Sequence, residues 1–141
     1  MAEQDNLRVI REVFDAWNAH DPNRMMKLFD EKFVGETDTL PAPMIGREAA
    51  GQVMEMYIRA FPDLRLTVDQ MIASGDTVVT RWTATGTQRG ELMGIAATNR
   101  STTTHGCVVA ELRDGKVVRD WNYWDTGNLL RQLGVLPPAA R

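Results

Sequence analysis

The feature that most constrains the fold is a change in residue pattern at Asp63. After it come four stretches rich in valine, threonine and aromatic residues, LRLTVDQMIA, DTVVTRWTATG, TTTHGCVVAEL and KVVRDWNYW, and Gly-Asp or Asp-Gly pairs separate several of them. β-Branched and aromatic residues favour strands, and such pairs favour tight turns. The second half of the chain therefore predicts four long antiparallel strands.

The residues before that change have helical spacing instead. Four apolar residues form one inward-facing stripe of a first helix: Leu7, Ile10, Phe14 and Trp17. Asp21 as N-cap and Pro22 as first helical residue indicate a short second helix that carries Met25, Leu28 and Phe29. A short strand is predicted over 33–37. The segment REAAGQVMEMYIRAFPDL predicts a third helix, whose continuation Pro62 blocks.

The order of these elements predicts the fold class. A last short helix over TGNLLRQLG has Asp125 as its N-cap and Gly134 as its stop. Helices come early and strands late, which indicates an α+β fold with helices packed on one face of a curved sheet. The 141 residues fit a single domain, 1–141, with an irregular end over 137–141.

Charge and cysteine content exclude several classes of function. The formal net charge is −3 with acids and bases interspersed, so no basic stripe indicates a nucleic-acid partner. Cys107 is the only cysteine, and no run of about 18 apolar residues indicates a membrane span. We therefore expect a soluble cytoplasmic protein. His20 and His105, the only histidines, lack metal-ligand spacing, and no nucleotide-binding motif is present, so we expect no metal and no cofactor.

The last two predicted strands form the most informative hairpin. With Asp114-Gly115 at the centre of a two-residue turn, Val109 would lie opposite Asp120, and His105 opposite Trp124. One face of the hairpin then combines polar and aromatic groups: His105, Cys107, Val109, Glu111, Val118, Asp120, Asn122 and Trp124. Apolar walls with a few convergent polar groups are typical of a small-molecule cavity.

Two alternatives remain open for this hairpin. A bulge would send Asp120 to the opposite face from His105, because a one-residue shift exchanges the two faces of a strand. Asp120 could also be an ordinary surface aspartate that pairs with Arg119 or Arg131. Trp17 could likewise be either plain core or part of a ligand-binding wall.

The chain resembles a known family. The resemblance rests on the segment FPDLRLTVDQMIASGDTVVTRWTATGTQRGELMGI and on DGKVVRDWNYWDTGNLLRQLGVLP, and extends over about residues 17–137. Both are similar to the SnoaL-like ester cyclases, the polyketide cyclases of the NTF2-like superfamily. Four positions differ from many relatives, which have Glu-His-Trp in place of Arg119-Asp120-Trp121 and histidines in place of Gln88 and Glu36.

The resemblance implies a cone-shaped fold, in which a strongly curved antiparallel sheet wraps around the N-terminal helices and leaves a deep pocket at the open end. It also implies a homodimer or homotetramer built on the outer sheet face, around Trp121 and Tyr123. In polyketide cyclases an aspartate on the last long strand is the acid/base, and a histidine on the preceding strand assists it. The matching positions are Asp120 and His105.

The resemblance and the residues together predict a function. We expect a small hydrophobic, polyketide-like β-keto ester to undergo intramolecular aldol closure, with Asp120 and His105 as catalytic residues. Four residues are expected to bind substrate: Trp17, Glu36, Asn122 and Trp124. The alternatives are an isomerase of steroid-like ketones, an epoxide hydrolase using Glu36, Arg81 and Asp120, and a non-catalytic binding or partner module of the same fold.

Overall fold

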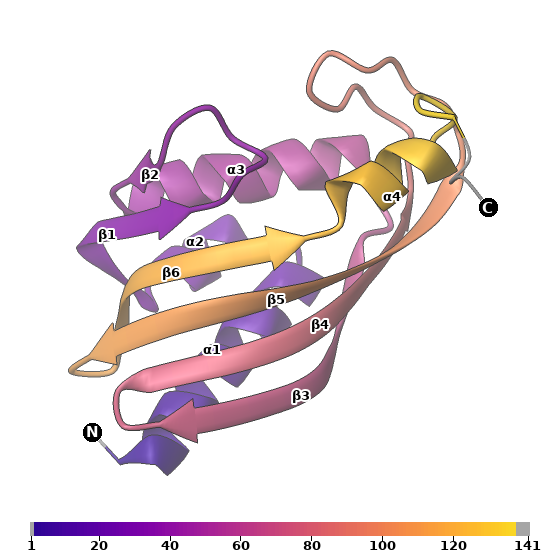
Figure 1. The fold of residues 1–141 in the computed structure, drawn as a ribbon. Helices are drawn as coiled ribbons and strands as arrows, with labels where there is room; N and C mark the ends of the chain where they lie inside the picture. The colour runs from indigo at the N-terminus through magenta and orange to yellow at the C-terminus, as the bar shows by residue number, and fades with distance from the viewer. Residues whose placement is uncertain (1, 138–141) are drawn as a thin grey trace.

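The computed structural model describes residues 2–137, and the expectation for 138–141 lies outside the described residues. Figure 1 shows four helices and six strands along this part of the chain. In order they are α1 (Glu3–Asn18), α2 (Pro22–Met26), β1 (Phe29–Glu36), β2 (Met44–Ile45), α3 (Arg47–Ala60), β3 (Arg65–Ser74), β4 (Thr77–Thr87), β5 (Ser101–Arg113), β6 (Lys116–Trp124) and α4 (Thr126–Gln132).

The predicted N-caps of the second and last helices are confirmed, but the second helix is shorter than predicted, because α2 ends at Met26 and Phe29 is the first residue of β1. The Asp21 carboxylate accepts a hydrogen bond from the backbone N–H of Arg24 at the start of α2, and Asp125 does the same for Asn128 at the start of α4. α3 ends at Ala60, two residues before Pro62. The first strand is longer than the predicted 33–37, because β1 begins at Phe29 and includes a charged stretch without strand character.

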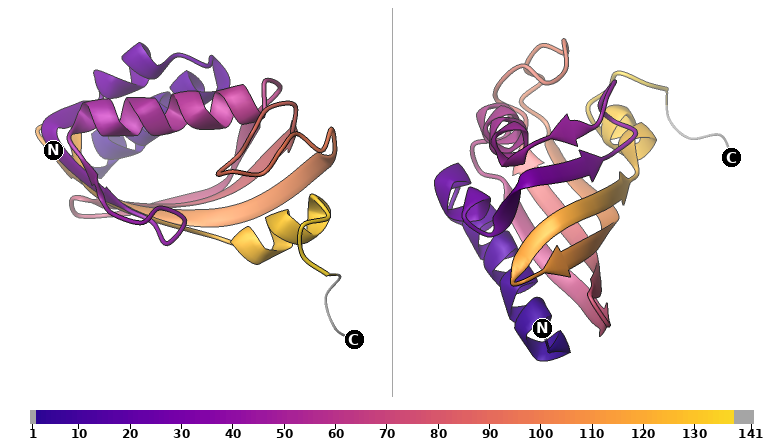
Figure 2. Two further views of the ribbon diagram at one scale, coloured as in Figure 1. Left: turned by 90° about the horizontal axis from the view of Figure 1, so that it is seen from above. Right: turned by 90° about the vertical axis from the view of Figure 1, so that its left-hand side faces the viewer.

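All strands belong to one sheet in the order β2-β1-β6-β5-β4-β3. Neighbouring strands are antiparallel except β1 and β6, which pair in parallel. The sheet is strongly curved, and α1 and α3 lie over its concave face (Figure 2, left). The α+β prediction, with a curved sheet wrapped around N-terminal helices, is confirmed.

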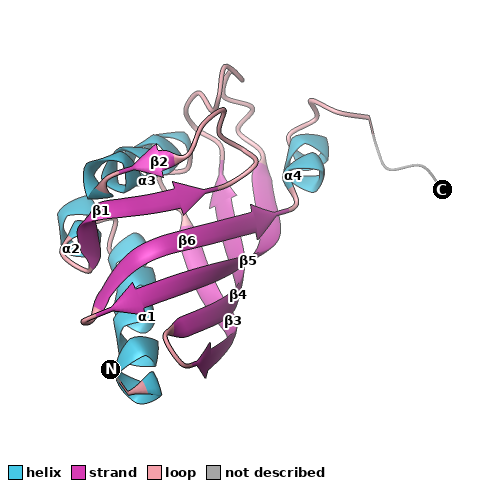
Figure 3. Cartoon of the chain, turned by 60° about the vertical axis from the view of Figure 1, so that its left-hand side comes forward, coloured by secondary structure: helices cyan, strands magenta, loops and turns pink. Residues whose placement is uncertain are grey.

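The core lies between α1 and the concave face of the sheet. Ile10 and Phe14 from the predicted stripe of α1 are buried, as are Val13 beside them, Val78 on β4 and Leu112 on β5. A second, smaller apolar cluster joins α4 to the end of α3 and to the β4–β5 loop: Ala60, Phe61, Leu92, Leu129 and Leu133. Figure 3 shows α4 where β6 ends. The space between the two clusters is where a cavity remains.

The predicted turn of the β5–β6 hairpin is confirmed, but the predicted register is wrong beyond it. Asp114 and Gly115 have φ of 52° and 76°, as a type I′ turn requires, and Leu112 lies opposite Val117 as predicted. The next pair is Glu111 with Arg119, so one additional residue of β6 forms a bulge.

The bulge changes which side chains of β5 share a face with Asp120. Ala110, rather than Val109, lies opposite Asp120, and Gly106, rather than His105, lies opposite Trp124. Each face of the hairpin therefore combines other residues of β5 and β6 than the prediction gave. Asp120 faces inward with the even-numbered residues of β5, whereas His105 faces outward.

The convex face of the sheet carries several partly exposed apolar side chains. Tyr123 on β6 is 54% exposed, and Trp121 lies two residues before it on the same face. This is the surface that the resemblance assigns to a second copy of the chain, and that assignment stays a prediction. Within residues 2–137, no helix combines the length and the apolar character needed to cross a membrane.

Candidate active site

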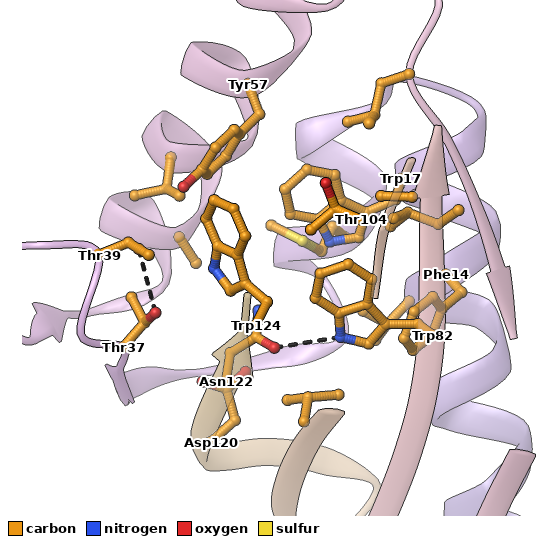
Figure 4. A pocket seen from close by; sticks show the side chains of 18 of the residues that line it. Phe14, Trp17, Thr37, Thr39, Tyr57, Trp82, Thr104, Asp120, Asn122 and Trp124 are labelled. Atoms are coloured by element: carbon orange, nitrogen blue, oxygen red, sulfur yellow. Dashed lines mark hydrogen bonds between the residues drawn. The ribbon is translucent and has the colours of Figure 1, made fainter. Parts of the chain in front are cut away.

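A cavity of about 190 Å³ lies between the concave face of the sheet and the helices. Its wall is formed mainly by apolar and aromatic side chains, among them three tryptophans: Trp17, Trp82 and Trp124. The polar groups of the wall are threonine hydroxyls, the Tyr57 hydroxyl, Asp120 and Asn122, several of which Figure 4 shows. Among the described residues that line the cavity, none is a lysine, arginine or histidine. The cavity therefore suits an uncharged, largely apolar ligand.

Asp120 is the only acidic side chain among the described lining residues. Its Oδ1 atom is buried and has no hydrogen-bond partner. Burial disfavours the charged form, which raises the pKa of Asp120 to about 7. At neutral pH this carboxyl group can therefore either accept or donate a proton.

Nearby cations do not neutralise Asp120. The ion pairs within residues 2–137 do not include it, so it is not the surface aspartate of the alternative interpretation. Arg119 faces outward, where its guanidinium lies 2.6 Å from the Glu36 carboxylate and 4.9 Å from the centre of the Trp121 ring. Strand alternation separates Asp120 from the adjacent Arg119, and the bulge before Arg119 determines that the acid faces the cavity.

Asn122 follows Asp120 on the same face of β6. Its Oδ1 atom accepts a hydrogen bond of 3.2 Å from Nε1 of Trp82 on β4 (Figure 4). A carboxyl group and a carboxamide thus face the same apolar cavity from one strand. This pair combines a proton acceptor with a hydrogen-bond donor.

Trp17 and Trp124 lie in the cavity wall, as predicted. Trp17 is at the end of α1, and Trp124 is the last residue of β6. The Trp124 ring meets that of Tyr57 on α3 edge to face, with centroids 6.2 Å apart. Their positions agree with the predicted substrate-binding roles, which stay predictions.

His105 and Glu36 do not line the cavity, which corrects two of the predicted site positions. His105 is exposed on the convex face and shares a hydrogen bond of 2.9 Å with the Thr83 hydroxyl. Glu36 pairs with Arg119, and this bond lowers the pKa of the Glu36 carboxyl group. In β1 alternation directs Phe33 inward and Glu36 outward, so neither expected partner can reach the Asp120 carboxyl group.

The arrangement needed for the epoxide-hydrolase alternative is also absent from the described residues. Arg81 lies on the convex face, where its side chain is 58% exposed and 3.9 Å from Asp69. Glu36, Arg81 and Asp120 therefore do not share one cavity, and the trio gives no support for that reaction.

Tyr57 and Trp82 are among the wall residues that the sequence analysis did not predict. Tyr57 follows Val53 by one helical turn, and both line the cavity. Val78, Thr80 and Trp82 are spaced two residues apart on β4, so strand alternation places all three on the same buried face. Burial raises the pKa of the Tyr57 hydroxyl, so it remains protonated and can donate a hydrogen bond. Helical spacing and strand alternation were the signals that could have identified them.

No metal site is evident in the part of the chain that the structure describes. Groups of three or more histidine, cysteine, aspartate or glutamate side chains that could hold an ion do not occur among residues 2–137.

Comparisons with known proteins agree with this fold and cavity. The family model described as SnoaL-like polyketide cyclase matches residues 7–133. No curated protein matched the sequence. AclR of Streptomyces galilaeus, provisionally described as a hydroxylase, has a similar structure, with 29% identity, a TM-score of 0.87 and coverage of 99% of this chain and 87% of AclR.

Two further structures are similar. IdmH of Streptomyces antibioticus, provisionally described as a polyketide cyclase, shares 29% identity with a TM-score of 0.81, over 92% of this chain and 99% of IdmH. A protein of Catenulispora acidiphila with a ketosteroid isomerase-like fold is 17% identical with a TM-score of 0.79, over 94% of this chain and 97% of that protein, and supports the fold alone. The chain therefore belongs to the SnoaL-like polyketide cyclase family and has the NTF2-like cone expected for it.

Proposed function

We propose that this chain catalyses a cofactor-independent intramolecular aldol closure of an uncharged β-keto ester. Asp120 removes a proton from the carbon between the two carbonyl groups of the substrate, which leaves an enolate. The enolate carbon attacks another carbonyl group of the same molecule, so a C–C bond forms and that carbonyl oxygen becomes an alkoxide. The alkoxide takes the proton back from Asp120, and the reaction needs no net proton or electron.

The observation that carries this proposal is the buried, unpartnered carboxyl group of Asp120 with a pKa of about 7. A general base works best when its pKa lies near the pH at which it operates. An ordinary aspartate, with a pKa near 4, would be a much weaker base toward carbon. The apolar wall raises the pKa of Asp120, because burial of the carboxyl group is the cause of the shift.

Asn122 supplies the hydrogen-bond donor that the enolate oxygen needs. Its amide nitrogen can donate into the cavity, while its oxygen is occupied by Trp82. A donor placed where negative charge develops typically contributes about 3 kcal/mol to lowering the barrier. Of His105 and Asn122, the two predicted site residues whose side chains could donate such a bond from the β5–β6 hairpin, only Asn122 lines the cavity.

The charge of the cavity supports an ester rather than a free acid. Because the described wall has no lysine, arginine or histidine, a substrate carboxylate would lose its hydration without gaining a counter-ion. It would also be repelled by ionised Asp120. An esterified substrate avoids both costs.

The first experiment is deuterium exchange. The purified protein is incubated in heavy water with an aromatic polyketide β-keto methyl ester, and mass spectrometry follows deuterium uptake while NMR identifies the product. We expect exchange at the carbon between the carbonyls, followed by a ring-closed product. Double-bond migration would assign an isomerase instead. No exchange above buffer with several ketones and esters would refute the proposed catalytic function.

The pH dependence of the reaction follows from the raised pKa of Asp120. Only the ionised carboxylate can accept the substrate proton, so kcat/KM should rise with pH, reach half its maximum near pH 7 and level off above pH 8. Initial rates measured from pH 5 to 9 test this. A profile that is flat between pH 5 and 9 would contradict assignment of the base to Asp120.

His105 should be dispensable for the reaction. Because it lies on the convex face with Thr83 as its partner, His105→Ala should change kcat/KM by no more than about twofold, as is usual for surface substitutions. Steady-state rates of the purified variant check this. A loss of tenfold or more would restore His105 to the site.

A further inference from the structure

We infer that Trp82 is a positioning residue that fixes the amide of Asn122 with its nitrogen toward the substrate, and that Gly106 provides the space that Trp82 needs. This inference rests on the role of Asn122 in the proposed function. Gly106 allows the position of the Trp82 ring, and the Trp82 ring in turn sets the orientation of the Asn122 amide.

The hydrogen bond between Trp82 and Asn122 has only one chemically allowed direction. An indole Nε1–H is a donor and never an acceptor, so the amide atom that faces it at 3.2 Å must be the oxygen. The amide nitrogen of Asn122 is then turned away from Trp82. Figure 4 shows this bond and, two residues earlier on β6, the side chain of Asp120. Without Trp82, the two ends of the amide are nearly equal in shape and the group can flip.

Gly106 explains how the Trp82 ring can reach Asn122. Gly106 lies opposite Trp82 on one side and opposite Trp124 on the other, in the middle of β5. A Cβ atom at this position would be 2.2 Å from Cζ2 and 2.6 Å from Cε2 of Trp82. Glycine weakens a strand interior and often marks a close approach. Here the approach is that of the Trp82 indole, which lies over the glycine backbone and is only 7% exposed.

Orientation of the amide matters most in the transition state. A flipped Asn122 would present its oxygen to the enolate oxygen, and two acceptors repel each other. The donor interaction strengthens as negative charge develops on the substrate, so its loss should lower kcat more than it raises KM. A tryptophan that only fills space in the wall would affect KM instead.

The first test combines NMR with kinetics. In 1H–15N spectra, the indole N–H signal of Trp82, assigned by its absence in Trp82→Phe, should move in Asn122→Ala. Trp82→Phe should lower kcat about 10- to 100-fold with KM changed by less than about threefold. In the Asn122→Ala background, Trp82→Phe should lower kcat little further, because the amide group that Trp82 orients is gone. Trp17→Phe, a change of another wall tryptophan, is the matched control and should act mainly on KM.

Gly106 is tested by a double variant. Gly106→Ala should displace the Trp82 ring, move its N–H signal and lower kcat as Trp82→Phe does. A phenylalanine ring lacks the Cζ2 and Cη2 atoms of the indole that approach Gly106. The double variant Gly106→Ala with Trp82→Phe should therefore be no slower than Trp82→Phe alone, and it should melt at a higher temperature than Gly106→Ala.

A binding assay separates failure of this inference from failure of the proposed function. In the Asp120→Asn background the amide stands in for the protonated carboxyl that follows proton removal, and 2-naphthol serves as an enol mimic. Fluorescence gives the ionised fraction of the bound naphthol, which we expect to fall about tenfold on adding Trp82→Phe or Asn122→Ala but not Trp17→Phe. That result would support the inference even if the wild type closed no ring.

Other results would overturn it. An indole signal that is unchanged in Asn122→Ala would show that the hydrogen bond does not form. Independent, multiplying losses in the double variant of Trp82 and Asn122 would show that each acts by itself. A Trp82→Phe effect limited to KM, or an equal loss of naphthol ionisation in the Trp17 control, would reduce Trp82 to part of the wall.

Discussion

Asp120→Asn is expected to lower kcat/KM for proton removal and ring closure by about 10²- to 10⁴-fold, the usual contribution of a positioned general base. Asparagine has nearly the same shape as aspartate but cannot accept the substrate proton. The cavity wall, the donor on Asn122 and the fold should remain in place, so substrate binding should persist. Deuterium uptake and product formation, followed side by side in wild type and variant, measure the loss.

Asp69→Asn is the matched control for this prediction. It makes the same change of one carboxylate to a carboxamide, but on the convex face, where Asp69 contacts Thr83 and Arg81. Its rate should stay close to that of the wild type. If Asp120→Asn retained more than a tenth of the wild-type rate while fully folded, another group would have to be the base.

The second large effect concerns stability. The pKa of Asp120 is about 7 in the folded chain against 3.8 for an ordinary aspartate, so between pH 4 and 7 the folded chain holds a proton that the unfolded chain has released. The free energy of unfolding should therefore fall as the pH rises through this window and remain low above it. Asp120→Asn removes this titration and should be more stable than wild type at pH 8 by roughly 2–4 kcal/mol.

Urea unfolding at pH 4.5 and pH 8 tests this prediction. The advantage of the variant should be present at pH 8 and nearly absent at pH 4.5, where the wild-type carboxyl group is neutral in the folded state. Asp69→Asn again serves as the control, and it should show no comparable gain at pH 8. Equal stability of wild type and Asp120→Asn at pH 8 would indicate that Asp120 is not desolvated in solution.

Much of the fold could be predicted because the local signals agree with one another. Helical spacing at Ile10 and Phe14 corresponds to the buried face of α1. The N-caps Asp21 and Asp125 mark the observed starts of α2 and α4, and α3 ends shortly before Pro62. The start of β1 was missed, because its charged residues do not alternate with apolar ones and its pairing with β6 depends on contacts distant in sequence.

Only part of the site was predicted, because one additional residue in β6 decides which residues of β5 share a face with Asp120. Asp120, Asn122 and Trp124 share a face in any register, and all three line the cavity. The partners expected from β5 were on the wrong face, since turn residues fix the register at the turn but do not reveal a bulge beyond it. For this reason His105, which was expected beside the cavity, lies on the convex face instead.

The bulge in β6 also has a consequence for engineering this scaffold. Val117 and Asp120 both face the cavity although three positions separate them, and only the additional residue, Val118, makes this possible. If β6 kept its length but lost the bulge, Val118 would lie opposite Glu111 and Arg119 opposite Ala110, so Arg119 would replace Asp120 on the cavity face. Libraries built on β6 should therefore preserve the bulge at Val118, because the presence of the bulge determines whether the cavity presents an acid or a guanidinium.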